Sequence, residues 1–274
     1  MSKDFNFDSI QKKIPKRSKN SHKGDFGRVM IIGGSEGMGG AAILSSEASL
    51  FCGSGLVHLN THPSNVEASL VRNPEVMALS INKSLSIPAN INVLLCGPGL
   101  KNDEWSNNIF NEVFKIKNIK TLIFDAGALE FVSEKKFDGN NNIILTPHPG
   151  EAAKLLGISS NEIQEDRINA AKEISKRFSA HVILKGKDTI ICSQNSEDIF
   201  ICSEGGPELS SGGTGDVLAG IVSALIAQKL DIIDACIISV AVHARAGKIF
   251  KNKTGEIGLN ASSLILTIRE LINK

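Results

Sequence analysis

Short apolar runs alternate with segments of helical periodicity along most of the chain, and this alternation restricts the fold more than any other feature. RVMIIGG (residues 28–34), GLVHLN (55–60) and NVLLCGPGL (92–100) have the composition of buried strands. The small residues of 38–52 predict a helix after the first of them. This order is typical of parallel sheets with helices on both faces. We therefore expect an α/β fold, a three-layer α/β/α sandwich with a mostly parallel central sheet.

The last third of the chain departs from simple alternation. HVILKGKDTII (181–191) and DIFICSEGG (198–206) predict an antiparallel pair at one end of the sheet, with a turn at Gly186–Asp188. From Thr214 onward the pattern is helical, with further helices over residues 231–250 and 259–273.

The domain organisation follows from length and linkers. The 274 residues exceed the usual domain of about 150, yet open α/β sheets often fill such lengths as one unit. No internal repeat or dividing linker interrupts the pattern. We expect a single catalytic domain over residues 21–274, preceded by a flexible, lysine-rich arm over 1–20 that lacks the apolar core of a signal peptide.

The composition restricts the kinds of partner that we expect this protein to bind. With 30 Lys and Arg against 29 Asp and Glu, the net charge of +1 lacks the surplus expected of a general nucleic-acid binder. At 42% hydrophobic and 22% charged residues, the chain is neither disordered nor membrane-spanning in character. Its five cysteines form no CxxC pair, which favours buried thiols in a reducing compartment. We expect a cytoplasmic protein with small-molecule substrates and neither nucleic-acid nor membrane partners.

The stretch SSGGTGDVLAGI, residues 210–221, is the first candidate site. Free N–H groups and the helix dipole favour an anion at a helix N-terminus, and Gly212, Gly213 and Gly215 would let the backbone approach a phosphate. Asp216 in the first turn would then act as a base or through a metal. On this stretch alone, a glycine hinge with an ordinary first-turn acid remains an equal alternative.

GGSEGMGG, residues 33–40, offers a rival phosphate loop. A dinucleotide-binding turn needs GxGxxG and an acid at the end of the next strand, whereas that strand here ends in Asn60. The spacing disfavours an NAD(P)-binding Rossmann site.

Two further side chains occupy unusual settings. His148 lies between two prolines in TPHPGE, a stiff loop where a ligand contact competes with a solvated loop residue as the explanation. Lys185 ends an apolar strand, where a lysine is costly unless it meets an anion or escapes to solvent. A nucleotide phosphate would satisfy it.

Taken in order, these segments resemble one family, the ADP/ATP-dependent NAD(P)H-hydrate dehydratases of the ribokinase-like superfold. The resemblance runs from His22 onward. It is carried by HKGDFGRVMIIGGS, GGAAILSSEASLFCGSGLV, GPGL, FDAGAL, TPHPGEAAKLLG, VILKGKDTII and SSGGTGDVLAGIVSALIAQ.

The resemblance implies an activity. Members of the family transfer a phosphate from ADP or ATP to the hydroxyl of NADH or NADPH hydrated at carbon 6, and its loss restores the dihydropyridine ring. ADP would yield AMP and phosphate. Mg²⁺ is expected for phosphoryl transfer, without assignable ligands, and relatives are often homo-oligomers. Two alternatives stay open: a vitamin-precursor kinase of the same superfold, and a nucleotide-sensing protein without turnover.

The resemblance also implies roles for individual residues. Asp216 corresponds to the catalytic acid facing the substrate, with Gly213 and Gly215 as amide donors to the phosphoryl group. The remaining positions fall into two groups. Substrate-binding positions are Ala41, Ala42, Gly99, His148 and Asp216, and nucleotide-binding positions are Lys185, Gly186, Lys187, Asp188, Thr189 and Gly215.

One segment departs from the family pattern. Where relatives usually read GNPGMASGG, this chain reads EGGPELSSGG, so Gly206 replaces an asparagine and Glu208 a glycine. Glu208 is therefore expected to add negative charge at the lip of a phosphate site.

Overall fold

The computed structural model describes residues 2–82, 84–137, 141–194 and 196–274. Within these ranges ten strands form one sheet. They are β1 (Ser2–Phe5), β2 (Arg28–Gly33), β3 (Leu56–Thr61), β4 (Met77–Ser80), β5 (Val93–Cys96), β6 (Thr121–Phe124), β7 (Asn142–Leu145), β8 (His181–Leu184), β9 (Thr189–Cys192) and β10 (Ile199–Cys202).

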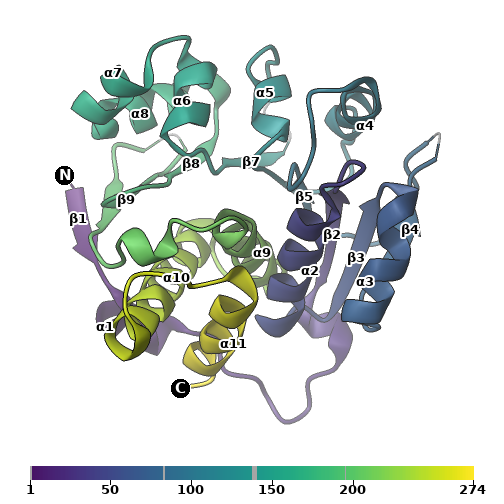
Figure 1. Cartoon of the computed structure of the whole chain (residues 1–274), viewed down its shortest axis with the longest axis horizontal. Coiled ribbons are helices and arrows are strands. Elements are labelled where there is room, and N and C mark those ends of the chain that lie inside the picture. The colour runs from purple at the N-terminus through teal and green to yellow at the C-terminus, as the bar shows by residue number, and fades with distance from the viewer. Residues whose placement is uncertain (1, 83, 138–140, 195) are drawn as a thin grey trace.

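The helices cover both faces of this sheet (Figure 1). They are α1 (Phe7–Ile10), α2 (Gly39–Phe51), α3 (Val66–Arg72), α4 (Glu104–Phe114), α5 (Ala128–Val132), α6 (Pro149–Leu156), α7 (Ser160–Glu165), α8 (Arg167–Phe178), α9 (Thr214–Ala227), α10 (Ile232–Thr254) and α11 (Ala261–Ile272). Short 3₁₀ turns add η1 (Gln11–Lys13), η2 (Lys23–Phe26), η3 (Pro63–Asn65) and η4 (Pro207–Leu209).

The strand order is β1-β10-β9-β8-β7-β6-β5-β2-β3-β4. β9 runs antiparallel to both β8 and β10, and the other described pairs are parallel. The expected mostly parallel three-layer sandwich is confirmed, and so is the antiparallel pair near one end of the sheet.

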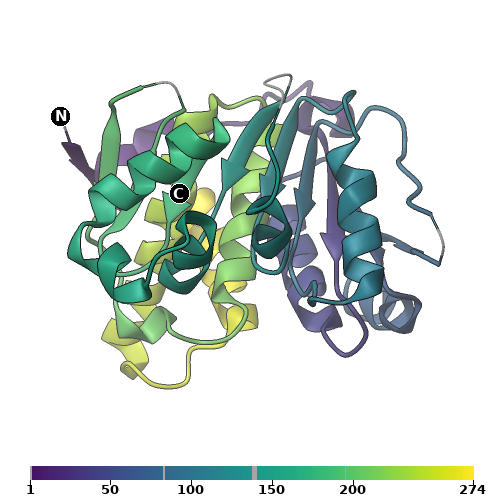
Figure 2. The same cartoon turned by 90° about the horizontal axis from the view of Figure 1, so that it is seen from above.

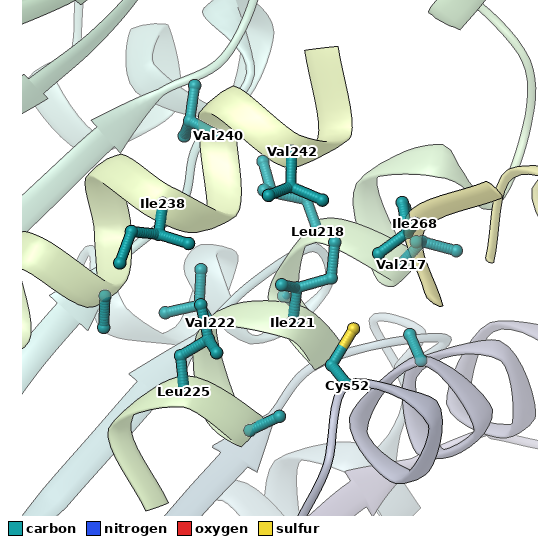
Figure 3. Packing of buried hydrophobic residues seen from close by; sticks show 14 of the residues in the cluster. Cys52, Val217, Leu218, Ile221, Val222, Leu225, Ile238, Val240, Val242 and Ile268 are labelled. Carbon is teal, nitrogen blue, oxygen red and sulfur yellow. The ribbon is translucent and has the colours of Figure 1, made fainter. Parts of the chain in front are cut away.

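Each central strand is buried on both faces. Along β5, Val93 and Leu95 belong to the core beneath α2, α9, α10 and α11, while Leu94 and Cys96 belong to the core beneath α4, α6 and α8. This two-sided burial explains why these strands read as continuous apolar runs. Figure 3 shows the first core, where α9 side chains such as Ile221 lie among those of α10.

The sheet reverses its winding between β2 and β5. From β2 the chain adds β3 and β4 on one side, and from β5 it adds β6, β7 and β8 on the other. Ligands of open α/β sheets bind at such switch points, beyond the carboxyl ends of the strands. The loops that follow β2, β5, β6, β7 and β8 all open at this edge.

The N-terminal segment is partly built into the domain. β1 pairs in parallel with β10 and lies at one edge of the molecule (Figure 2). Arg245 of α10 binds Asp8 through two hydrogen bonds of 3.0 and 2.7 Å. The predicted flexibility of residues 1–20, and the boundary at residue 21, stay predictions.

Candidate active site

The glycine loop leads into α9 as expected. Gly213 has φ of 91°, and a Cβ there would lie 2.7 Å from Leu44 Cδ1, so only glycine fits this turn. Thr214 Oγ1 donates to the carbonyls of Leu209 (2.8 Å) and Ser211 (2.9 Å), which fixes the loop. The N–H groups at the start of α9, including that of Gly215, are therefore held in fixed positions.

Asp216 lies in the first turn of α9. Burial raises the pKa of its carboxyl from 3.8 to about 7, with the negative charges of Asp125 and Glu151 adding to the effect and Lys185 opposing it. A general base is most effective when its pKa lies near the working pH. The position and the pKa of Asp216 suit a group that accepts a proton at neutral pH.

Among the described residues, three charged side chains act on Asp216: the carboxylates of Asp125 and Glu151 and the ammonium of Lys185, the one cation. Its Nζ lies 2.7 Å from Asp125 Oδ1 and 3.9 Å from Glu151 Oε2. A Cβ on Gly215 would lie 3.3 Å from the same Nζ, so the lysine reaches the glycine loop. Lys185 at the end of its apolar strand thus meets an anion, as one of the two sequence alternatives required, and this anion is a carboxylate of the same chain.

Asp125 anchors the charge group. Its carboxylate is 1% exposed and also accepts a 2.7 Å hydrogen bond from Thr146 Oγ1. Burial alone would lower the pKa of Lys185, but the carboxylates of Asp125, Glu151 and Asp216 together raise it above its usual value. Lys185 therefore stays charged, and a phosphate entering between it and the Gly215 amide would meet a fixed positive charge.

Residues 185–189 form the turn between β8 and β9. Gly186 has φ of 132° and Asp188 of 54°, and Thr189 Oγ1 donates to the Gly186 carbonyl at 3.0 Å. Arg167 lies behind this turn, with Nη2 donating to the carbonyls of Leu184 and Lys185, both at 3.2 Å. Lys187 is exposed. Five of the six predicted nucleotide-binding residues therefore lie in one turn that Arg167 holds through its carbonyls, and the sixth, Gly215, lies in the first turn of α9.

Gly99 and Ala41 meet at the switch point. A Cβ on Gly99 would lie 2.4 Å from the Met38 carbonyl oxygen and 3.2 Å from Ala41 Cβ. The Ser35 amide donates to the Gly99 carbonyl at 2.9 Å, so the rival loop of residues 33–40 and the Gly99 turn form one wall. Ala42 is fully buried and Ala41 is half-buried, so Ala41 is the member of this pair that a ligand can contact.

His148 caps α6. Its Nδ1 accepts hydrogen bonds from the amides of Gly150 (3.0 Å) and Glu151 (3.3 Å), while Glu151 Oε2 accepts one from the His148 amide (2.7 Å). Burial and the charge of Lys185 lower the pKa of the imidazole. The ring is thus neutral at pH 7 with its hydrogen on Nε2, and its side chain is 56% exposed.

Glu208 at the altered lip is turned away from solvent. The residue is 2% exposed, and its Oε2 has no hydrogen-bond partner among the described residues. A Cβ on Gly206 would lie 2.8 Å from this oxygen. The loss of a side chain at 206 therefore makes room for the one gained at 208, whose carboxylate shares a small cavity with Lys248 and Lys251.

The structure unites most of the predicted residues. Glu151 contacts both His148 and Lys185, and Lys185 joins them to Gly215 and Asp216. The Gly99 wall connects through α2, since Ser45 Oγ donates to the Asp216 carbonyl at 3.0 Å.

Sequence reasoning missed Asp125, Glu151 and Arg167 as parts of this site. Asp125 had a signal, an acid that ends the apolar run of FDAGAL. Glu151, three residues after His148, had the spacing of a capping box. Arg167 offered none, because its partners are the backbone carbonyls of Leu184 and Lys185, and every residue carries a carbonyl.

The sequence identifies no metal ligands. Among the described residues, no group of three or more His, Cys, Asp or Glu side chains is arranged to hold a metal ion. Asp125 and Glu151 are the carboxylates that approach Lys185 Nζ.

Comparisons with known proteins place this site in a family. A bifunctional NAD(P)H-hydrate repair enzyme of Vibrio cholerae is 40% identical over 95% of this chain and 52% of its own length. The chain spans about half the length of the bifunctional relatives it matches. An ADP-dependent (S)-NAD(P)H-hydrate dehydratase of Neisseria meningitidis is 33% identical over 94% of this chain and 89% of its own.

Solved structures agree with these relatives. The ADP/ATP-dependent NAD(P)H-hydrate dehydratase from Bacillus subtilis, co-crystallized with ATP/Mg²⁺, superposes with a TM-score of 0.89 at 26% identity, covering 97% of this chain and 95% of that one. A ribokinase-like superfamily protein from Enterococcus faecalis gives 0.85 at 26% identity, covering 99% and 95%. A family model for NAD(P)H-hydrate dehydratase matches residues 29–270. The chain therefore has the ribokinase-like fold and belongs to the NAD(P)H-hydrate dehydratase family.

Proposed function

We propose that this chain dehydrates NADH or NADPH hydrated at carbon 6 and uses ADP as the phosphoryl donor, releasing AMP and phosphate. The observation that carries the proposal is Asp216, a carboxyl with a pKa of about 7 at the start of α9, beside Lys185 and the free amide of Gly215. The dehydratases of Neisseria meningitidis and Staphylococcus aureus, which share 33% and 35% identity with this chain, are named as ADP-dependent.

The first step is phosphoryl transfer. Asp216 accepts the proton of the substrate hydroxyl as its oxygen bonds to the terminal phosphorus of ADP, and the bond from that phosphorus to the bridging oxygen breaks to release AMP. The amide of Gly215 and the ammonium of Lys185 stabilise charge on the transferring group. Charge-assisted donors at fixed positions are worth most where water is excluded.

The second step is elimination. The lone pair of the ring nitrogen expels phosphate from carbon 6, and loss of a proton from carbon 5 restores the double bond. Phosphorylation makes this step feasible because hydroxide is a poor leaving group. His148 Nε2 lies 3.3 Å from Glu151 Oε1, and the partly exposed, neutral ring would offer its open face to the bound cofactor.

Mg²⁺ fits the donors that the site offers. Mg²⁺ in nucleotide sites is usually held by one or two carboxylates together with phosphate oxygens and water. Asp125 and Glu151, the two carboxylates next to Lys185, would supply the protein ligands, and the nucleotide would supply the phosphates. The ion would neutralise charge on those phosphates.

The kinase alternative has less support, since the hydroxyethylthiazole kinase from Pyrococcus horikoshii shares only the fold, at 15% identity and a TM-score of 0.58. Hydrated NADH incubated with ADP, and separately with ATP, tests the proposal through recovery of dihydronicotinamide absorbance. We expect recovery with ADP, and loss of turnover in Asp216→Asn with ADP affinity within a few-fold. Absence of recovery with either nucleotide would refute the dehydratase function.

We also propose that the chain forms a homo-oligomer. Val71 (80% exposed) lies on α3 and Leu266 (55%) on α11, and a 3.0 Å hydrogen bond from Arg72 to Ser262 links the end of α3 to the start of α11. Sedimentation of the wild type and of Val71→Glu distinguishes an assembly from a monomer.

Cellular location is a separate proposal. All five cysteines are free and buried, in line with a reducing compartment, and the cytoplasm stays the predicted one. No helix in the described ranges is long and apolar enough to cross a membrane.

A further inference from the structure

A second cavity, of about 1130 Å³, lies between the N-terminal segment after α1 and the C-terminal ends of α2, α9 and α11. α2 and α9 begin at the active site and end at this cavity, with C-caps at Cys52 and Gln228. Helices of this length span about 20 Å. The cavity is therefore separate from the site of the reaction, and Figure 1 shows the C-terminus beside the purple N-terminal segment that forms one wall.

The lining of this cavity is strongly cationic. Among the described residues that line it, Glu75 alone carries a carboxylate side chain. The cationic side chains are Lys12, Lys16, Arg17, Arg72, Arg269 and Lys274. Since the whole chain carries a net charge of only +1, this concentration sets the cavity apart from the average surface. A concave wall of one sign focuses the field on an anion inside it.

Internal contacts account for part of this charge. Arg17 donates to the Gly53 carbonyl at 2.7 Å, as expected for a cation at the end of a helix. Arg72 is paired with Glu47 at 3.0 Å. Lys12 and Lys16, in contrast, are exposed and have no partner in the part of the chain that the structure describes. Their charges are therefore free to meet an anion in the cavity.

The cavity also has an apolar part. The half-buried side chains of Leu50, Phe51 and Ile272 contribute to the lining, and the Arg269 guanidinium lies 4.8 Å from the centre of the Phe51 ring. Pockets for small ligands commonly combine such a surface with a few charged groups. A ligand with both a planar ring and several negative charges matches this lining better than a bare inorganic anion.

We propose that this cavity is a second binding site for a nucleoside di- or triphosphate. The phosphates would lie against Lys12 and Lys16, and the base against the apolar wall near Phe51. The site would be occupied independently of turnover, because none of its residues contributes to the reaction proposed above.

Calorimetric titration with ADP tests the proposal. The wild type is expected to bind two ADP per chain, and Lys12→Glu/Lys16→Glu to lose one of them by about tenfold or more in affinity. Lys115→Glu/Lys176→Glu changes the charge equally at exposed positions elsewhere and should keep both. Turnover and the KM for ADP should be unchanged in both variants, and circular dichroism checks their folding.

Each other result has one meaning. A single ADP site that persists in Lys12→Glu/Lys16→Glu overturns the proposal, whereas a single site lost in that variant supports it even if the chain has no dehydratase activity. Pyrophosphate that binds this cavity as tightly as ADP overturns the nucleotide assignment. Wild-type binding to RNA or to phosphatidylserine vesicles that displaces ADP would assign the surface to a macromolecule and also overturn it.

Discussion

Asp216→Asn should lower turnover and raise the free energy of unfolding, and the size of the gain in stability should depend on pH. The carboxyl of Asp216 has a pKa of about 7 in the folded protein against 3.8 ordinarily. Because the folded state holds the proton more tightly, the wild type loses stability as pH rises from about 3.8 to about 7, and the loss is complete above that. Asn carries no charge at any pH, so the variant escapes this loss.

The size of the effect follows from the shift. One pKa unit corresponds to about 1.4 kcal/mol, so a shift of roughly three units gives an upper limit of about 4 kcal/mol. Asp216 keeps some solvent contact, and we expect a gain of about 2 to 4 kcal/mol in the free energy of unfolding at alkaline pH.

Urea unfolding at about pH 4 and about pH 8.5 measures this gain, since most of the loss of stability falls between these two values. The variant should exceed the wild type at the higher pH and approach it at the lower one, while turnover falls at least about 100-fold. Glu134→Gln, which neutralises an exposed carboxylate without a partner in the described structure, serves as the control. Equal stability of Asp216→Asn and wild type at both pH values would refute the argument that burial destabilises the charged form of this carboxyl.

Three further predictions concern the same group of residues. Asp125→Ala removes both the charge and the acceptor oxygen 2.7 Å from the largely buried Lys185 and should cost about 3–5 kcal/mol in urea unfolding; a cost below about 1 kcal/mol would show that the pair is not a structural anchor. Arg167→Lys should raise the KM for ADP more than that for the hydrated cofactor, whereas Arg177→Lys on the same helix should change neither; equal effects of the two variants would contradict the positioning role. kcat/KM should rise with pH to a plateau above about 7 as Asp216 loses its proton, and a flat profile would exclude it as the base.

The central strands could be predicted because burial on both faces leaves a continuous apolar signal. The β8–β9 turn was predicted for a different reason, since Gly186 and Asp188 permit left-handed backbone. β4 (Met77–Ser80) was not predicted, because it is an edge strand whose last two residues are exposed. β1 was missed too, since three of its four residues are exposed and its pairing partner β10 is distant in sequence.

The site residues also divide into those that a local sequence pattern reveals and those that it does not. The glycine loop and the KGKDT turn are local in sequence, and their residues were found. The pairing of Asp125 with Lys185, in contrast, spans 60 positions and depends on β6, β7 and β8 ending at one edge of the sheet. No local pattern specifies which carboxylate meets a given lysine. Arg167 is hidden for a different reason, because it acts through the backbone carbonyls of Leu184 and Lys185, which no residue type marks in the sequence.

Stoichiometry of a single reaction mixture tests the central claim most directly. Hydrated NADH and ADP are incubated with the protein, and NADH, AMP and inorganic phosphate are quantified together. Phosphoryl transfer followed by elimination predicts that the three products appear in equal amounts and that none appears with Asp216→Asn. A phosphorylated cofactor that accumulates with AMP, without NADH or free phosphate, would show a kinase and contradict the account.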